Sequence, residues 1–278
     1  MQVIDRAFVR GLMPARDQGG HKGTFGKVYL LGGSVGYTGA PVLCAGGAVH
    51  SGCGLVFLGV PETVWPIAAA RCLCAMPHPL AEQDGRLSAA AETEIRHRAA
   101  VCDAVAVGCG LGRSEGSDAL VNALLTLEKP LVLDADGINA LAGHIDILDS
   151  RSAPTLLTPH DGEFQRLTGC ALPLEDRLAA ARDFAAAHRC GLILKGHATV
   201  TAAPDGRAWV NVTGNPGMAK GGSGDVLSGI AAGLWGQKHL RSGDSDLWSL
   251  AAQAVAIHAA CGDLCARELG EYAMTPGD

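Results

Sequence analysis

Short apolar runs alternate along the chain with longer stretches in which alanine and polar residues mix. The apolar runs predict strands, and the stretches between them have the length and composition of helices. Predicted strands cover residues 27–31, 55–60, 104–107, 131–133, 155–157 and 192–194. Predicted helices cover residues 41–51, 62–71, 88–99, 116–127, 161–168 and 175–188. Because the strands are apolar throughout and alternate with helices, the pattern predicts a mostly parallel sheet with helices on both faces.

The pattern changes after Lys195. Two β-rich runs, 199–203 and 208–212, flank the turn Pro204-Asp205-Gly206-Arg207 and predict a β-hairpin. A Gly-rich loop then leads to two final predicted helices, at 223–235 and 246–268. Neither a repeat nor a linker interrupts this order, so the sequence predicts one α/β domain over residues 1–278.

Composition limits the possible partners. With 278 residues, 48% of them hydrophobic, the chain can bury a core without metal or disulfide staples. The formal net charge is −6 and no Lys/Arg block is present, which argues against nucleic acid or an anionic membrane as a partner. We find no uncharged apolar run long enough to cross a bilayer and no signal-peptide pattern in Met1–Arg6. A cytoplasmic protein is therefore expected.

The ten cysteines are interpreted as small buried hydrophobic residues in a reducing compartment. The close pairs Cys72/Cys74 and Cys261/Cys265 do not have the C-x-x-C spacing of a zinc or redox motif. The cysteines that stand in apolar runs, and are expected to be buried, are Cys44, Cys53, Cys74, Cys102, Cys109, Cys190 and Cys261.

Polar and Gly-rich segments follow several predicted strands. In an open parallel sheet, ligands bind beyond the carboxyl ends of the strands, so these segments are expected to meet at one edge. They are Gly32-Gly33-Ser34, Gly108-Cys109-Gly110-Leu111-Gly112, Asp134-Ala135-Asp136, Thr158-Pro159-His160 and Lys195-Gly196-His197.

The strongest candidate site is the turn Gly221-Gly222-Ser223-Gly224, followed by Asp225 at the start of a predicted helix. Glycines let backbone amides point inward, and the helix N-terminus adds partial positive charge, so the turn predicts an anion hole for phosphate. Asp225 faces the same space and is placed to take a proton from a substrate oxygen. An ordinary helix N-cap after a flexible loop would give a similar pattern.

Two segments with carboxylates each admit two interpretations. His160 and Glu163, one helical turn apart, either bind a polar ligand or Mg²⁺ through water, or mark a helix start. Asp134 and Asp136 either hold a hydrated Mg²⁺ or cap the next helix. Other histidines on predicted helices are interpreted as surface or satisfied core residues: His50, His97, His188 and His258.

Two glycine-containing segments also remain open. Lys195-Gly196, with Thr199, either contacts phosphate or ribose or forms an ordinary turn at a strand end. Gly108-x-Gly110-x-Gly112 follows a strand like a dinucleotide fingerprint, but its third glycine comes one residue early. We interpret it as a loop that approaches a ligand closely.

In this order the motifs resemble the ADP-dependent NAD(P)H-hydrate dehydratase family. The resemblance begins at about Ala15 and implies a ribokinase-like three-layer αβα sandwich with a mostly parallel central sheet. The epimerase domain that is fused to some family members is expected to be absent. The motifs that carry the resemblance are His21-Lys22-Gly23-Thr24-Phe25-Gly26, Gly32-Gly33-Ser34, Gly39-Ala40, Gly110-Leu111-Gly112, Leu133-Asp134-Ala135-Asp136-Gly137, Leu157-Thr158-Pro159-His160, Lys195-Gly196 and Gly214-Asn215-Pro216-Gly217-Met218-Ala219-x-Gly221-Gly222-Ser223-Gly224-Asp225.

The resemblance implies repair of the S epimers of NADHX and NADPHX, the hydrated forms of the reduced nicotinamide cofactors. A nucleotide, ADP in bacterial members and ATP in eukaryotic ones, phosphorylates the ring hydroxyl with Mg²⁺ present. Phosphate then leaves as the double bond re-forms, and AMP is the other product from ADP. The resemblance also implies a homo-oligomer, a tetramer, and a separate NAD(P)H-hydrate epimerase as a functional partner.

Residue roles follow from the same resemblance. Ala40, Gly112, His160 and Asp225 match hydrate-binding positions, and Asp225 matches the catalytic base. Glu163 matches a Mg²⁺-associated glutamate of related vitamin kinases, while Cys109 and Asp161 stand where the family usually has proline. The positions that match nucleotide-binding residues are Lys195, Gly196, His197, Ala198, Thr199 and Gly224.

Three other functions remain as alternatives. A kinase for a vitamin-precursor alcohol would share the fold and the anion hole but would release a stable phosphorylated product. A nucleotide-binding sensor without turnover would be expected to lack the base, and Asp225 is present. An NAD-dependent oxidoreductase is disfavoured by the incomplete glycine fingerprint.

Overall fold

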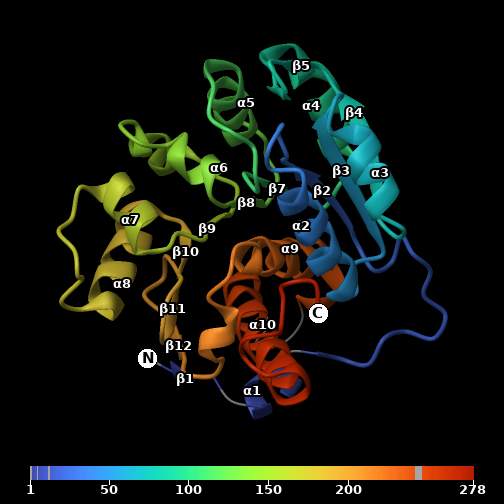
Figure 1. Cartoon of the computed structure of the whole chain (residues 1–278). Helices are drawn as coiled ribbons and strands as arrows, with labels where there is room; N and C mark the ends of the chain where they lie inside the picture. Colours follow the sequence, from blue (N-terminus) through green and yellow to red (C-terminus); the bar gives the residue numbers. More distant parts are fainter. Residues whose placement is uncertain (1, 5, 12, 242–245) are drawn as a thin grey trace.

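Ten strands in the described part of the chain form one central sheet (Figure 1). The computed structural model describes residues 2–4, 6–11, 13–241 and 246–278. The strands are ordered β1-β12-β11-β10-β9-β8-β7-β2-β3-β4 across the sheet. Their bounds are β1 (Gln2–Val3), β2 (Lys27–Leu31), β3 (Leu55–Pro61), β4 (Met76–Leu80), β7 (Ala104–Val107), β8 (Leu131–Leu133), β9 (Thr155–Leu157), β10 (Gly191–Leu194), β11 (Thr199–Ala202) and β12 (Ala208–Asn211).

The sheet is parallel except at β11. That strand runs antiparallel to both β10 and β12, so β11 and β12 are the hairpin that the turn at 204–207 predicts. All pairs from β10 to β4 across the sheet are parallel, as continuous apolar strands joined by helices require. The mostly parallel sheet is therefore confirmed.

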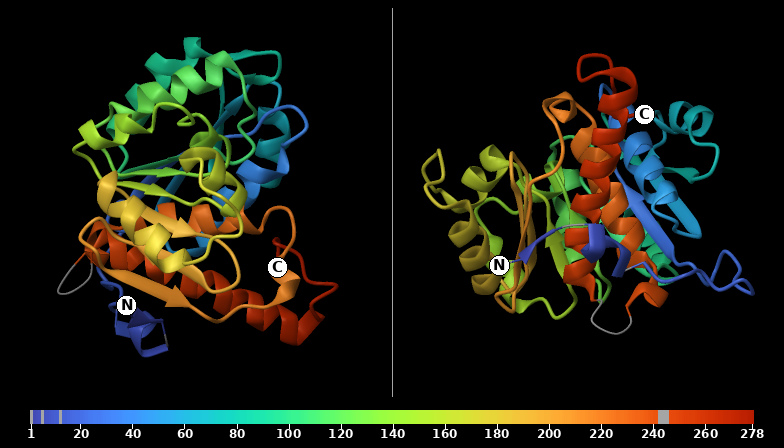
Figure 2. Two further views of the ribbon diagram at one scale, coloured as in Figure 1. Left: turned by 90° about the vertical axis from the view of Figure 1, so that its left-hand side faces the viewer. Right: turned by 90° about the horizontal axis from the view of Figure 1, so that it is seen from below.

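Helices cover both faces of this sheet (Figure 2). Alternate residues of β2 face opposite layers: Tyr29 and Leu31 pack into one buried cluster, and Val28 and Leu30 into the other. The first layer contains α4 (Glu92–Ala100), α5 (Glu115–Leu125), α6 (Asp136–Asn139), α7 (Asp161–Thr168) and α8 (Arg177–Ala187). The second contains α2 (Gly39–His50), α3 (Trp65–Arg71), α9 (Ser223–Gly236) and α10 (Leu247–Leu269). The expected three-layer αβα sandwich is confirmed.

Small residues let α9 lie unusually close to α2. A Cβ added at Gly229 would lie 1.9 Å from the Cys44 carbonyl oxygen, and one at Gly233 would lie 2.0 Å from Ser51 Oγ. Only glycine fits at such a distance, which explains the glycine-rich sequence of α9. The close packing fixes this helix in the second layer, with its N-terminal end at the carboxyl ends of the strands.

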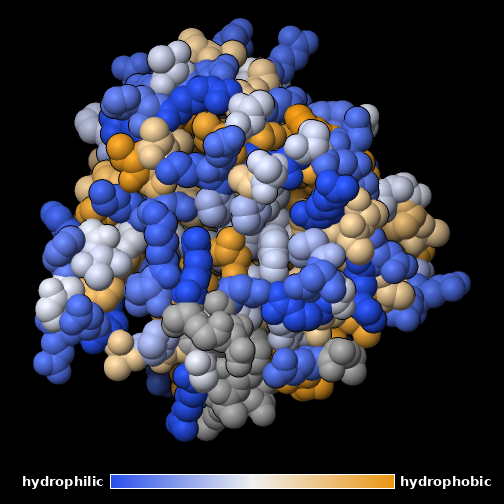
Figure 3. Space-filling model, turned by 180° about the vertical axis from the view of Figure 1, so that it is seen from behind, coloured by the Kyte–Doolittle hydropathy of each residue, from blue (hydrophilic) through white to orange (hydrophobic). Residues whose placement is uncertain are grey.

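Helix α10 is long and apolar enough, by length and composition, to cross a bilayer. Half of its most apolar stretch is buried inside the fold, where Leu250 and Val255 belong to the same cluster as α9. We therefore interpret it as a core helix. On the face seen in Figure 3, hydrophilic side chains predominate and apolar residues lie in small scattered groups.

The structure also holds elements that the apolar pattern did not predict. Strand β4 contains Pro77 and Pro79, which argue against a strand in the sequence. It lies at the edge of the sheet, where prolines are tolerated. A small hairpin, β5 (Glu82–Gln83) and β6 (Arg86–Leu87), is joined by Asp84 and Gly85, whose φ values are 51° and 71°. Asp-Gly is a strong signal for a two-residue hairpin turn, so the sequence could have predicted this turn. The helix α1 (Arg6–Gly11) and strand β1 near the start of the chain were also missed.

The expectation that the seven cysteines are buried is wrong for two of them. Cys74 lies in the loop after α3, and Cys261 lies on the outer side of α10; both are exposed. Helix α10 is only half buried, so an apolar sequence there does not place every residue inside. The buried members are Cys44, Cys53, Cys102, Cys109 and Cys190.

Candidate functional site

Loops at the carboxyl ends of β8, β9 and β10 and the N-terminal end of α9 surround a cavity of about 880 Å³. The predicted clustering at one sheet edge is thus correct for these segments. Of the predicted site residues, those that line the cavity are Asp134, His160, Lys195, Gly196, His197, Ala198, Thr199, Gly222, Ser223, Gly224 and Asp225.

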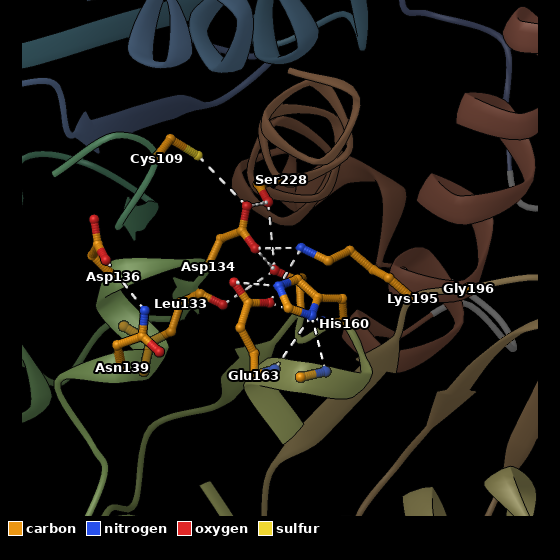
Figure 4. Close-up of polar contacts among 12 residues, drawn as sticks. Cys109, Leu133, Asp134, Asp136, Asn139, His160, Glu163, Lys195, Gly196 and Ser228 are labelled. Atoms are coloured by element: carbon orange, nitrogen blue, oxygen red, sulfur yellow. Dashed lines mark hydrogen bonds and ion pairs between the residues drawn. The ribbon is translucent and has the colours of Figure 1, made fainter. Parts of the chain in front are cut away.

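The wall of this cavity is built on a buried ion pair (Figure 4). The Asp134 carboxylate accepts hydrogen bonds from Lys195 Nζ at 2.8 Å, from Thr158 Oγ1 at 2.7 Å and from Ser228 Oγ at 2.7 Å. Burial opposes the charge of Asp134, but Lys195 and the two hydroxyls outweigh it and lower its pKa. Burial likewise opposes the charge of Lys195, but Asp134 and Glu163 outweigh it and raise the lysine pKa. Lys195 is therefore a fixed cation at the cavity.

Asp225 has a different environment. Burial, and then the negative charge of Asp134, raise the pKa of the Asp225 carboxyl to about 6. Its carboxylate lies within 4.8 Å of both Cys109 Sγ and the Asp134 carboxylate. Such a group is ionised at neutral pH and still basic enough to accept a proton, which suits a general base.

Backbone amides at the start of α9 face the same space. Gly222 caps the helix with φ 102°, a conformation that favours glycine. Among the described residues, the amides of Gly224 and Asp225 have no hydrogen-bond partner, as expected in a first helical turn. A Cβ at Gly224 would lie 3.3 Å from Lys195 Nζ, so ammonium and amides converge. This arrangement can bind a phosphate group. Gly221 does not line the cavity, and the anion hole at Gly221–Gly224 stays a prediction.

His160 and Glu163 form a reciprocal helix cap. His160 Nδ1 accepts from the amides of Gly162 and Glu163, and Glu163 Oε2 accepts from the His160 amide at 2.8 Å. The same Glu163 oxygen lies 3.8 Å from Lys195 Nζ, while the His160 side chain is 55% exposed and lines the cavity. The helix start is therefore confirmed, and Mg²⁺ binding by Glu163 stays a prediction.

Asp134 and Asp136 point to different partners (Figure 4). Asp136 Oδ2 accepts from the Gly112 amide at 3.0 Å, and Oδ1 accepts from Asn139 Nδ2 at 3.2 Å. Asp134 is occupied by the donors around Lys195. The structure thus assigns one carboxylate to an ion pair and the other to holding the Gly112 loop, rather than both to one cation.

The predicted hydrate-binding residues lie in two groups. Ala40 and Gly112 lie outside the cavity: Ala40 at the start of α2, and Gly112 on the loop that follows β7. A Cβ at Gly110 would lie 2.9 Å from the Ala40 Cβ, so this loop packs against the start of α2. Cys109, at the beginning of the loop, lies beside Asp225. Asp225 therefore stands between the cavity on one side and two segments on the other: the start of α2 with Ala40, and the loop after β7 with Gly112.

Comparison with known proteins decides the family. The model of the NAD(P)H-hydrate dehydratase family matches residues 28–278. The chain belongs to this family. It is 43% identical over 281 residues to the bifunctional NAD(P)H-hydrate repair enzyme Nnr of Moorella thermoacetica, covering 100% of this chain and 52% of that protein. It is 37% identical to the ADP-dependent (S)-NAD(P)H-hydrate dehydratase of Bacillus subtilis, covering 96% of this chain and 90% of that one.

Solved structures agree with this family. The ADP/ATP-dependent NAD(P)H-hydrate dehydratase of Bacillus subtilis, co-crystallised with ATP and Mg²⁺, superposes with a TM-score of 0.83 at 33% identity, covering 99% and 93% of the two chains. A ribokinase-like superfamily protein of Enterococcus faecalis gives 0.84 at 25% identity, covering 99% and 91%. The ribokinase-like fold is therefore confirmed. The chain spans about half the length of the bifunctional relatives that it matches.

The two departures from the usual family pattern occupy structured positions. Cys109 is buried, with its Sγ 3.8 Å from Asp134 Oδ2. Asp161 pairs with Arg177, whose guanidinium donates to the carbonyls of Leu194 and Lys195 at 3.1 and 3.0 Å. Asp161 thus holds the arginine that supports the segment predicted to bind nucleotide.

Several site residues were missed or interpreted differently from the sequence. Ser228 follows Asp225 by one helical turn, so the sequence could have predicted its position at the site. No local sequence pattern predicts that of His258. His258 was interpreted as an ordinary surface or core residue, yet it lines the cavity, with Nε2 3.3 Å from Ser223 Oγ. Burial lowers the pKa of His258 to about 4, so the ring is neutral. Ala135 and Ala198 also line the cavity with φ values of 45° and 57°, the backbone strain expected near functional sites.

Proposed function

We propose that the chain catalyses the nucleotide-dependent dehydration of the S epimers of NADHX and NADPHX, which regenerates NADH and NADPH. The observation that carries this proposal is the position of Asp225, which lines the cavity and lies beside Cys109, on the loop that leads to Gly112. A base at that junction can reach a hydroxyl from one side while a phosphoryl donor approaches from the other. The names of the family relatives support the same activity.

The first step is phosphoryl transfer to the hydrate. The ring hydroxyl gives its proton to Asp225, and its oxygen bonds to the terminal phosphorus of the nucleotide. The bond from that phosphorus to the bridging oxygen breaks, which releases AMP from ADP or ADP from ATP. Lys195 and the amides of Gly224 and Asp225 stabilise the charge on the transferred group, which supplies most of the catalysis in such reactions.

The second step is elimination. The bond between the ring carbon and the phosphate oxygen breaks, and phosphate leaves with the electron pair. Water takes a proton from the adjacent ring carbon, and the electron pair of that C–H bond re-forms the double bond of the dihydronicotinamide. Phosphate is a much better leaving group than hydroxide, which is the chemical reason for using a nucleotide.

Mg²⁺ suits this site as a companion of the nucleotide. The ion keeps several waters and is usually held by one or two carboxylates together with substrate phosphates. Glu163 supplies a buried carboxylate beside Lys195 and would hold the ion through water. Bound Mg²⁺ would neutralise phosphate charge.

The protein's setting is part of the proposal. We place it in the cytoplasm as a homo-oligomer, a tetramer, that works with a separate NAD(P)H-hydrate epimerase. The bifunctional name of the longer relatives supports the partnership. Sedimentation equilibrium at several concentrations tests the oligomer, and a monomer throughout would contradict it.

One experiment separates this activity from that of a vitamin-precursor kinase. The protein is incubated with NADHX, Mg²⁺ and either ADP or ATP, and both 340 nm absorbance and the ³¹P NMR spectrum are followed. A nucleotide-dependent rise in absorbance with inorganic phosphate formed in equal amount supports the dehydratase and identifies the donor. A stable phosphate ester without a rise, or no reaction from folded protein that binds nucleotide, would contradict it.

A further inference from the structure

The β5–β6 hairpin places Arg86 on the side of the site where Ala40 and Gly112 lie. Its turn is fixed in place because the Gly85 carbonyl accepts from the Val35 amide at 2.9 Å. Val35 belongs to the loop after β2 that leads into α2 and Ala40. Arg86, the first residue of β6, therefore has a defined position beside the loops of the site.

Arg86 lies directly against Gly112. A Cβ added at Gly112 would lie 3.0 Å from Arg86 Nε and 2.9 Å from Ser34 Oγ. Gly112 also has φ 71°, which favours glycine, so both space and conformation exclude a side chain there. The Arg86 side chain thus packs against the backbone of Gly112, a position predicted to bind the hydrate.

The charge of Arg86 is not matched within the described part of the chain. Its Nε is buried without a hydrogen-bond partner, and its NH1 has one long contact, 3.4 Å to the Asp84 carbonyl. Among the described residues no carboxylate forms an ion pair with it. By contrast Arg113, which follows Gly112, pairs with Asp118 at 3.4 Å. A buried, unpartnered donor on a cation points to an external anion.

We propose that Arg86 binds a phosphate group of the dinucleotide hydrate and so determines the class of substrate that this site accepts. The guanidinium fork matches phosphate oxygens in geometry and charge. This inference rests on the proposed function, which puts the hydrate's ring at Asp225. From Cys109, beside Asp225, to Gly112 is three Cα steps, a reach of at most about 11 Å. A dinucleotide lying along that loop brings its phosphates to Arg86.

Two phosphates can supply this contact. The pyrophosphate is common to NADHX and NADPHX, whereas the 2′-phosphate is present only in NADPHX. Steady-state kinetics of Arg86→Ala with both hydrates distinguishes them. An increase in KM for both assigns the pyrophosphate, and an increase for NADPHX alone assigns the 2′-phosphate.

For the affected substrate we expect KM to rise about ten- to a hundredfold, the usual effect of losing a charge-assisted hydrogen bond, with kcat changed less than about threefold. Arg86→Lys keeps the charge and should recover part of the affinity. Arg113→Ala is the matched control, because it removes a neighbouring arginine that already has a partner. Unchanged KM values in Arg86→Ala, or an equal rise in Arg113→Ala, would overturn the assignment.

Calorimetric binding of NADH and NADPH keeps this test independent of turnover. Absence of turnover in the wild-type protein would defeat the proposed function alone, since Arg86→Ala should still weaken dinucleotide binding more than tenfold. Normal wild-type turnover with unaltered binding in Arg86→Ala would defeat only the present inference.

Discussion

The carboxylate of Asp225 should lower the stability of the fold at neutral pH. Burial raises its pKa from 3.8 to about 6, a difference of about two units. Each unit corresponds to about 1.4 kcal/mol, so the ionised group destabilises the folded chain by about 3 kcal/mol. Between pH 3.8 and 6 the folded chain keeps a proton that the unfolded chain has released. The free energy of unfolding therefore falls as pH rises through this window.

Asp225→Asn removes the group that titrates, so its effect on stability should depend on pH. The free energy of unfolding of the variant, minus that of the wild type, should grow by about 3 kcal/mol between roughly pH 4 and pH 7. Urea unfolding at closely spaced pH values measures this difference. Any constant offset from the substitution cancels in the comparison.

Asp183→Asn is the matched control, because Asp183 is exposed on α8 and loses the same charge without the same burial. Its difference from the wild type should stay nearly constant with pH. If the Asp225→Asn difference is equally constant, or shrinks as pH rises, the argument that burial and the Asp134 charge destabilise the ionised base is refuted. A gain in stability upon loss of a functional residue would fit the trade-off seen at many active sites.

Three further outcomes are expected. Below about pH 6, kcat/KM should fall roughly tenfold per pH unit as Asp225 is protonated, and a flat profile would argue against it as the base. Lys195→Met leaves the Asp134 carboxylate buried without its cation, so the free energy of unfolding measured in urea should fall by about 3–5 kcal/mol. Calorimetry should also show weaker nucleotide binding. Normal values of both would contradict the role of the ion pair. Gly229→Ala should destabilise the fold by about 1–3 kcal/mol in thermal unfolding, since its Cβ would meet the Cys44 carbonyl; an unchanged melting temperature would count against the close packing of α2 and α9.

The fold could be predicted from the sequence where strands are buried along their whole length. Strands β7, β8 and β9 are short runs of Ala, Val, Leu and Thr covered on both faces, and their predicted bounds match the structure. Strand β4 was missed because an edge position tolerates Pro77 and Pro79. Strand β1 was missed because two residues paired with β12 leave no periodic pattern.

The site could be predicted from the sequence where its functional residues are consecutive in the chain. Gly222–Asp225 and Lys195–Thr199 are contiguous, and both line the cavity. The pair of Asp134 and Lys195 joins residues 61 apart in the chain, so only the parallel order of β8, β9 and β10 brings them together. His258 reaches the cavity from α10 by helix packing, which no local pattern encodes.

The most direct test is the recovery of NADH from NADHX, followed at 340 nm with Mg²⁺ and ADP or ATP, for wild type and Asp225→Asn in parallel. We predict a nucleotide-dependent rise with the wild type and a rate at least about a hundredfold lower with the variant, whose nucleotide binding stays intact. Equal rates in the two proteins would contradict the role of Asp225, and no rise from nucleotide-bound wild type would contradict the dehydratase itself.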